Sequence, residues 1–269
     1  MIDRLPKRRW QDMKTTDFQG AAVVDWIAVL PVAAIEQHGP HLPVGTDTII
    51  GEGMIDAALS VMPDALPVSV LPIQQIGKSN EHISSPGTLT HDWQTVIQAW
   101  IEIGESVNRA GLKKMIIINS HGGNVSLIDI VARELRVRHE MLVVATSWAR
   151  FGVPDALVDQ TEQTYGIHGG DDETSMMLHL RPDLVDMSNA KDFRSTQLDF
   201  LGEFKQLRAH GPVPFGWKAQ DLNVEGTVGN AAEATAEKGE LRIQHQAAAF
   251  VDLCHDVHAF DLDRLWKPA

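Results

Sequence analysis

Cysteine is almost absent from this chain, since Cys254 is the only one among 269 residues. A single thiol excludes an intramolecular disulfide and favours a reducing compartment. Long apolar runs are also missing, because no stretch approaches the roughly 20 residues that a membrane-spanning helix needs. The basic cluster Lys7-Arg8-Arg9 is followed by no apolar run, so it does not resemble a signal peptide. We therefore expect a cytoplasmic protein without a membrane partner.

Positive charge is scarce as well. The chain carries 23 Lys and Arg against 36 Asp and Glu, which gives a formal net charge of −13. No basic patch is visible, and this argues against a nucleic acid as partner. The remaining composition, 43% hydrophobic and 22% charged, is ordinary for a soluble globular protein. Because the sequence shows no internal repeat and no break in composition, its length predicts one domain over residues 1–269.

Short apolar segments alternate with amphipathic ones along the chain. The segments that predict strands are residues 27–35, 66–73, 115–119 and 141–148. The segments that predict helices are residues 47–62, about 92–110, 125–139, 176–181 and about 231–258. This alternation predicts an α/β fold with a mostly parallel sheet and right-handed crossovers. The polar loops that follow the strands should then converge on one edge of the sheet.

Two segments lack a regular pattern, and the last predicted helix has one apolar face. Residues 149–170 and 183–230 lack clear periodicity, and the glycines and prolines of the second range indicate a long structured loop near an active site or a subunit contact. In the last helix, the spacing of four apolar residues indicates a buried face: Leu241, Ala248, Val251 and Cys254. Cys254 is therefore expected to pack in the core rather than to do chemistry.

Carboxylates and imidazoles gather in the loop that follows the first predicted strand. Glu36 and His38 are two residues apart, so their side chains share a face of extended backbone. Asp47 stands at the start of the next helix, where the free N–H groups favour an anion. Oxygen and imidazole ligands without a thiolate suit Zn, Mn or Fe. The alternative is a turn whose polar residues are merely solvated.

Later loops add candidates of the same kind. They are His121, after the third predicted strand, and the pair His168 and Glu173. A hydrolytic metal site needs such ligands, an open position for water and a nearby acid or base. A second ion would need a bridging carboxylate, and Asp47 is the natural candidate for that role. These residues predict a metal-dependent hydrolase. Two other interpretations remain open: a non-catalytic metal-bound scaffold, and an anion cradle in residues 120–124, although that loop lacks the lysine and spacing of a P-loop.

Four motifs, in order, resemble the creatininase (creatinine amidohydrolase) family. They are Glu36-x-His38-Gly39-Pro40-His41-Leu42-Pro43 with Thr46-Asp47, Ser79-x-Glu81-His82 with Pro86-Gly87-Thr88, Asn119-x-His121-Gly122-Gly123-Asn124, and His168-Gly169-x-x-x-Glu173-Thr174-Ser175. The resemblance spans about residues 27–187, and the stretch 226–239 is also similar. It implies a three-layer αβα fold, a site for two divalent ions and a homohexamer. Family members open cyclic amides or cleave formamides and peptide bonds.

The resemblance also implies roles for particular residues. Glu36, Asp47 and His121 would hold one metal ion, and His38 would hold the other with Asp47 as the bridge. His168 matches the family's proton-transfer histidine. The residues that would contact substrate are Ser79, Glu81, His82, Gly122, Gly123 and Trp148, the last because it is near the family's active-site tryptophan.

The sequence departs from creatininase proper at two places. Creatininase has a metal-binding Glu two residues beyond the histidine that matches His121, where this chain has Gly123. Glu173 is the candidate replacement ligand and a second catalytic candidate. Creatininase also has a lid tryptophan shortly before the histidine that matches His168, whereas residues 163–167 contain none. We therefore predict that the protein hydrolyses a small cyclic amide or a formamide, and creatinine itself is the alternative substrate. We expect two divalent ions as cofactors, Zn or Mn, with Fe as a further option.

Overall fold

A computed structural model describes residues 5–155 and 157–266. Its central sheet has four parallel strands in the order β2-β1-β3-β4. The strands are β1 (Ile27–Val32), β2 (Val68–Val70), β3 (Lys114–Asn119) and β4 (Leu142–Ser147). Every residue of β1, β2 and β3 is buried, as expected for a parallel sheet that is covered on both faces.

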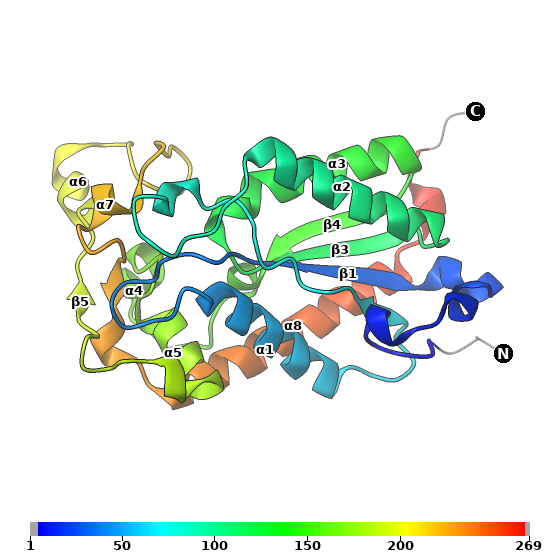
Figure 1. Cartoon of the computed structure of the whole chain (residues 1–269), viewed down its shortest axis with the longest axis horizontal. Helices are drawn as coiled ribbons and strands as arrows, with labels where there is room; N and C mark the ends of the chain where they lie inside the picture. The colour runs from blue at the N-terminus through cyan, green and yellow to red at the C-terminus, as the bar shows by residue number, and fades with distance from the viewer. Residues whose placement is uncertain (1–4, 156, 267–269) are drawn as a thin grey trace.

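Helices cover both faces of this sheet (Figure 1). One face carries α2 (Trp93–Arg109) and α3 (Val125–His139), and the other carries α1 (Thr46–Val61) and α8 (Ala236–Ala259). Each face has its own apolar core, one built around Met54, Ile116 and Phe250 and the other around Leu30, Trp100 and Ile117. The predicted three-layer αβα fold is thereby confirmed. In the ranges 5–155 and 157–266, the apolar part of each helix falls short of what crossing a membrane requires.

The carboxyl ends of the strands point toward the end of the molecule that is opposite the two termini (Figure 1). Short elements gather at this end: α4 (Gln160–Tyr165), α5 (Asp171–Leu180), α6 (Gln197–Glu203), α7 (Ala219–Leu222) and an antiparallel pair of β5 (Asp192–Phe193) with β6 (Gly229–Asn230). Single 3₁₀ turns join many of the elements, at Trp10–Asp12, Thr15–Phe18, Ala21–Asp25, Asn80–His82, Gly122–Asn124, Trp148–Phe151, Pro182–Leu184, Ala231–Glu233 and Leu262–Arg264.

Several predicted boundaries were wrong. The ranges 149–170 and 183–230 are not wholly irregular, because α4, α6 and α7 lie within them. These helices have seven residues or fewer, too short for an apolar period to appear in the sequence. The helix expected from residue 176 begins at Asp171, because the acidic first turn, which favours a helix N-terminus, belongs to it.

The buried face of α8 differs from the prediction. Leu241 is 50% exposed and Ala248 is also exposed, whereas Val251 and Cys254 are buried as expected. The face includes Arg242, which is only 8% exposed. Apolar spacing cannot identify this position, because a charged residue becomes buried only where a partner elsewhere in the chain compensates it. Cys254 lies in the core, so its predicted packing role is confirmed.

Candidate active site

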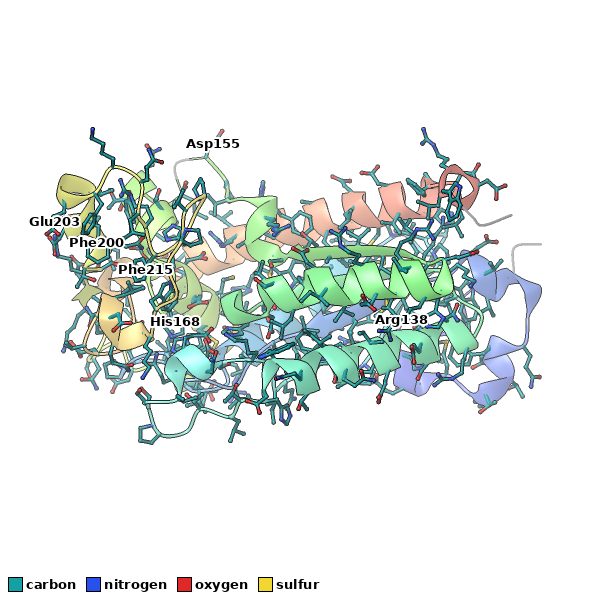
Figure 2. All side chains as sticks on the ribbon, turned by 90° about the horizontal axis from the view of Figure 1, so that it is seen from above. Arg138, Asp155, His168, Phe200, Glu203 and Phe215 are labelled. Carbon is teal, nitrogen blue, oxygen red and sulfur yellow. The ribbon has the colours of Figure 1, made fainter. Side chains whose placement is uncertain are left out.

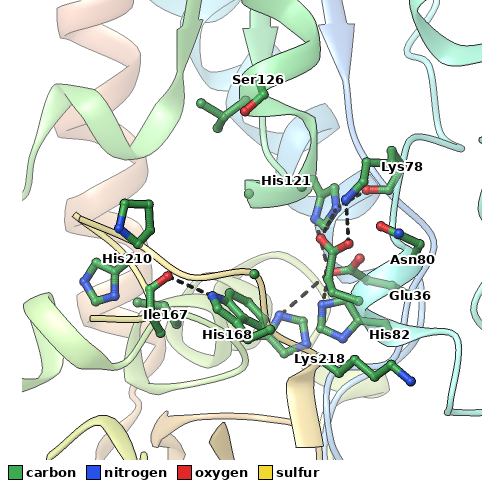
Figure 3. Close-up of a pocket in the computed structure, with 18 of the residues that line it drawn as sticks. Glu36, Lys78, Asn80, His82, His121, Ser126, Ile167, His168, His210 and Lys218 are labelled. Atoms are coloured by element: carbon green, nitrogen blue, oxygen red, sulfur yellow. Dashed lines mark hydrogen bonds and ion pairs between the residues drawn. The ribbon is translucent and has the colours of Figure 1, made fainter. Parts of the chain in front are cut away.

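The candidate residues meet at the carboxyl ends of β1 and β3 (Figure 3). Glu36 and His38 follow β1, and Asp47 is the second residue of α1. His121 follows β3, while His168 and Glu173 come from the turn before α5 and from its first turn. Figure 2 shows His168 and Phe215 at this end of the molecule, far from Arg138 on α3. The parallel sheet thus brings together loops that are distant in sequence, as the sequence predicts.

The first group of potential ligands is Glu36, Asp47 and His121, all buried. His121 Nδ1 lies 3.2 Å from Glu36 Oε1 and 3.1 Å from Asp47 Oδ2. The other ring nitrogen, Nε2, donates to the backbone carbonyl of Lys78 at 3.0 Å. A carbonyl behind the ring is the usual way to orient a metal-binding histidine, and it leaves Nδ1 facing the carboxylates.

The second group is His38, Asp47 and Glu173. His38 Nε2 lies 3.2 Å from Asp47 Oδ1 and 3.7 Å from Glu173 Oε2, and His38 Nδ1 donates to the carbonyl of Glu36 at 3.0 Å. Asp47 therefore directs one carboxylate oxygen toward each histidine. Glu173 also accepts a hydrogen bond from the backbone N–H of Gly169 at 2.6 Å, which fixes the turn before α5.

Charges in this cluster compensate one another. Burial alone would lower the pKa of His38, but the carboxylates of Asp47, Glu173 and Glu36 together outweigh it and raise the pKa to about 10. Burial would also lower the pKa of His121, but Glu36 and Asp47 outweigh this effect and leave the pKa well above its ordinary value. In return, these histidines lower the pKa values of Glu36 and Asp47 in spite of their burial. Burial and nearby Asp47 raise the pKa of Glu173 to about 7.

The donor set fits divalent metal ions. Among the described residues, three buried atoms that face the cluster lack a hydrogen-bond partner: Glu36 Oε2, His38 Nε2 and Asp47 Oδ2. Buried polar atoms without a partner are costly, and a bound cation would satisfy all three. Carboxylates with imidazoles suit Zn or Mn. A third combination, Glu36 with His38 and His168, also meets the distance requirement for a metal ion.

His168 is buried beside this cluster. Its ring lies 4.2 Å from the ring of His38 and 4.3 Å from that of His82, centroid to centroid. Nε2 lies 2.7 Å from the carbonyl oxygen of Gln37, so we assign the proton to this nitrogen. Nδ1 then remains an acceptor, 3.7 Å from Glu36 Oε1. Burial and the charge of His38 hold the pKa of His168 well below its ordinary value, so the ring is neutral.

A cavity of about 1140 Å³ opens over the cluster. Four of the six predicted substrate contacts line it: Glu81, His82, Gly122 and Gly123. Ser79 is instead fully buried, with Oγ 3.4 Å from His121 Nε2. Trp148 is also buried and packs on Phe250, with a centroid distance of 5.0 Å, so it lies away from this cavity.

Sequence reasoning missed much of the opposite wall. Residues from 209 to 221 line the cavity there, including His210, Phe215, Trp217 and Lys218. Their glycines and prolines indicated a loop near a site or a contact, but the residue pattern could not choose between these. The predicted alternative of an anion cradle at residues 120–124 fits poorly, because five carboxylate side chains line the same cavity: Glu36, Asp47, Glu81, Glu173 and Asp221.

Comparison with known proteins gives consistent matches. The family model described as "Creatininase: Creatinine amidohydrolase" matches residues 11–254. The creatinine amidohydrolase of Pseudomonas putida is 30% identical over 240 residues, which cover 83% of this chain and 86% of that protein. The mycofactocin precursor peptide peptidase of Mycolicibacterium smegmatis is 31% identical over 216 residues, covering 80% and 78%.

Solved structures agree with these relatives. A manganese form of creatininase superposes with a TM-score of 0.74 at 25% identity, over 94% of this chain and 100% of the other. A creatininase variant of the Zn–Zn type gives a TM-score of 0.74 at 25% identity, over 94% and 99%. With a family match over nearly the whole chain and relatives at 30% identity, this chain belongs to the creatininase family of hydrolases.

Proposed function

We propose that the protein is a two-metal amidohydrolase that hydrolyses a C–N bond of a small cyclic amide or a formamide. The observation that carries the proposal is the position of Asp47, whose two carboxylate oxygens face two separate histidines. This is the arrangement expected of a bridging ligand between two ions. Glu36 and His121 would complete one ion site, and His38 and Glu173 the other.

Two bound divalent ions would lower the pKa of a water molecule and polarise the amide carbonyl. The residues of the chain supply orientation and proton transfer. Backbone carbonyls of Lys78 and Glu36 hold His121 and His38 with the required nitrogen facing inward. Glu173 accepts from Gly169 through Oε2 and so keeps its carboxylate in place at the edge of the cavity. Such fixed orientation removes part of the entropic cost of reaching the transition state.

His168 is suited to carry a proton from the attacking water to the leaving nitrogen. It is neutral, and its Nδ1 is an acceptor on the side of Glu36. The Gln37 carbonyl fixes the ring. The neighbouring ring of His82 is kept neutral chiefly by its burial, and its pKa is lowered to about 3. A positioned acid–base group of this kind contributes typically 10²- to 10⁴-fold in rate.

Two expectations accompany this proposal. The chain is taken as one domain over residues 1–269, and it is expected to assemble as a homohexamer, as the resemblance implies. Exposed apolar side chains at the active-site end would suit subunit contacts, for example Leu201, Phe204 and Val213. Light scattering of the purified protein measures this directly, and a monomer at micromolar concentration would contradict it.

The function is tested by hydrolysis assays on protein loaded with Zn²⁺ or Mn²⁺. The panel contains cyclic amides, formamides and short peptides, with metal-free protein and the His168→Gln variant as controls. The proposal requires turnover of at least one amide that depends on both the ions and His168. If metal-loaded protein binds two ions but hydrolyses none of these compounds, the non-catalytic scaffold becomes the better interpretation.

A further inference from the structure

A second cavity, of about 400 Å³, adjoins the first one. The two share a wall made of six residues, namely Ser120, His121, Gly122, Val125, Ile167 and Glu173. Because His121 and Glu173 belong to the candidate ion sites, a substrate held at these sites has space on two sides. An amide whose carbonyl lies at the ion sites would thus have one cavity on either side of its scissile bond.

Arg242 is the feature that distinguishes the second cavity. It lies on α8, lines this cavity and is only 8% exposed. Its Nε lies 2.6 Å from Asp172 Oδ1, yet neither atom makes a hydrogen bond of good geometry. In the described part of the chain, the ion pair with Asp172 through Nε is the contact that the structure gives for this guanidinium. A guanidinium offers five N–H donors, so an ion pair through Nε leaves the Nη donors available to a ligand in the cavity.

The second cavity has two carboxylates, Asp172 and Glu173, and it favours a small anion when both are engaged, Asp172 by Arg242 and Glu173 by a metal ion. Arg150 lines the same cavity and is exposed, while Asp172 contacts Arg242 at Nε. Trp148 supplies an apolar wall. Gln246 is held by its hydrogen bond to the carbonyl of Gly152 at 2.8 Å. Such a pocket suits a short aliphatic segment that ends in a charged group.

We propose that the second cavity binds a carboxylate of the substrate through Arg242. The substrate class would then be amides that carry a carboxylate a few carbons from the scissile bond. The planar guanidinium fork matches a carboxylate in a bidentate geometry, and such charge-assisted pairs are stronger than neutral hydrogen bonds. This inference rests on the proposed amidohydrolase function, because it names the substrate of the same site.

The competing explanation is structural. Asp172 and Arg242 join α5 to α8, two helices that pack closely, and the ion pair could serve this contact alone. Both explanations expect Arg242→Gln to lose stability, since it leaves the half-buried carboxylate of Asp172 without its partner. The double variant Arg242→Gln with Asp172→Asn removes both charges and avoids this cost, so it can be assayed if the single variant does not fold.

The kinetic experiment compares matched amides on metal-loaded enzyme. Glutaramate carries a carboxylate where pentanamide ends in a methyl group, and succinamate and adipamate vary the spacing. We expect the wild type to prefer one acidic amide over its neutral counterpart. In the Arg242 variants the ratio of kcat/KM for the two should fall by roughly 10- to 100-fold. Equal losses for both amides would mean that Arg242 has only a structural role, and would overturn the proposal.

Two further measurements complete the test. Arg138→Gln is the matched control, because Arg138 is also paired with a carboxylate, that of Glu134, but is exposed at the far end of the molecule (Figure 2). It should leave the ratio unchanged. Glutarate binding to metal-free protein, measured as a rise in Tm, tests the carboxylate site without any catalysis. If no amide is hydrolysed but glutarate stabilises the wild type and not the double variant, the amidohydrolase function fails and the carboxylate site stands. If glutarate raises the Tm of both proteins equally, the carboxylate site is overturned.

Discussion

The carboxylate of Glu81 occupies the space that a side chain at Gly123 would need. A Cβ at position 123 would overlap Glu81 Oε1, the backbone carbonyl of Lys78 and His121 Nε2. Glu81 is held there by an ion pair with Lys78 at 2.9 Å, and its Oε1 lies 3.6 Å from His121 Nε2. A glutamate at this position, which the resemblance to creatininase proper would imply, therefore requires Glu81 and the backbone at Lys78 to shift. Glu173 approaches His38 from the other side instead.

The first prediction follows from this overlap. Gly123→Ala and Gly123→Glu should each lower the free energy of unfolding by roughly 1–3 kcal/mol, because the backbone carbonyl of Lys78 cannot easily move aside. Gly122→Ala is the matched control, since a Cβ at Gly122 would meet no atom of the described residues within 4 Å. Denaturant unfolding of the three variants measures the difference. Equal stability of the Gly122 and Gly123 variants would show that Glu81 and the Lys78 carbonyl move aside at little cost.

The second prediction concerns metal loading. The protein should bind up to two Zn²⁺ or Mn²⁺ ions per chain, and saturating metal should raise Tm by roughly 5–10 °C at 100 times Kd, since a ligand that binds only the native state stabilises it. Chelation should reverse the shift and abolish activity. Asp47→Asn should reduce both, whereas Glu52→Gln, an exposed carboxylate on the same helix, should not. Elemental analysis that finds no metal after reconstitution would refute the site.

The third prediction separates two roles of Glu173. Its carboxylate faces His38 and also accepts from the Gly169 N–H, so it could be an ion ligand or only a support for the turn. We expect Glu173→Gln to retain one ion and lose the other. Glu237→Gln, in the first turn of α8, is the matched control for a carboxylate near a helix start. A Glu173→Gln protein that keeps both ions and loses about 1 kcal/mol of stability would support the capping role alone.

The fourth prediction is a release of protons on metal binding. Without metal, the raised pKa values of His38 and His121 keep both rings protonated at pH 7. Ligand nitrogens must be neutral, so ion binding should release about two protons and tighten as pH rises toward 10. The same charges stabilise the metal-free fold below the unfolded pKa of His38, and this stability should be lost as pH rises through about 10.

Calorimetric titration in buffers with different ionisation enthalpies counts these protons. The pH dependence of unfolding, measured on metal-free protein, checks the sign independently. Binding without proton release at pH 7 would mean that both imidazoles are already neutral in the free protein.

The strands and the loops that follow them are the features that the sequence predicts best, because each strand shows the same simple pattern. The four strands were placed within a few residues, since parallel strands buried on both faces appear as short apolar runs before a polar loop. The convergence of Glu36, Asp47 and His121 follows from the same topology, because loops after parallel strands meet at one sheet edge.

What remained hidden depends on contacts between distant segments. Arg242 is buried because Asp172 lies opposite it, and no periodicity in α8 reveals this. Glu81 fills the space beside Gly123 only after the two loops fold together. Likewise, Phe215 and Trp217 reach the cavity from a segment whose short elements carry no detectable period. Charged and aromatic residues in loops take their positions from the whole fold rather than from their neighbours in sequence.

The last prediction concerns creatinine. Residues 163–167 contain no tryptophan and fall mostly in α4, and Trp148 is buried against Phe250 away from the main cavity. The cavity of about 1140 Å³ is therefore much larger than a small planar ring needs, and the ring loses an aromatic contact that is typically worth about 0.5–1.5 kcal/mol. The ligand cluster and His168 remain in place, so the chemistry should survive while the specificity changes. We expect kcat/KM for creatinine to be lower than for other small amides in the panel.

Trp217 is the one tryptophan that lines this cavity in the described part of the chain, and its Nε1 donates to the Ala209 carbonyl at 2.8 Å, which holds it at the wall. If creatinine proved the best substrate and Trp217→Ala abolished that preference, this tryptophan would have to leave the wall and close over the ring, and the inferred change of specificity would be wrong.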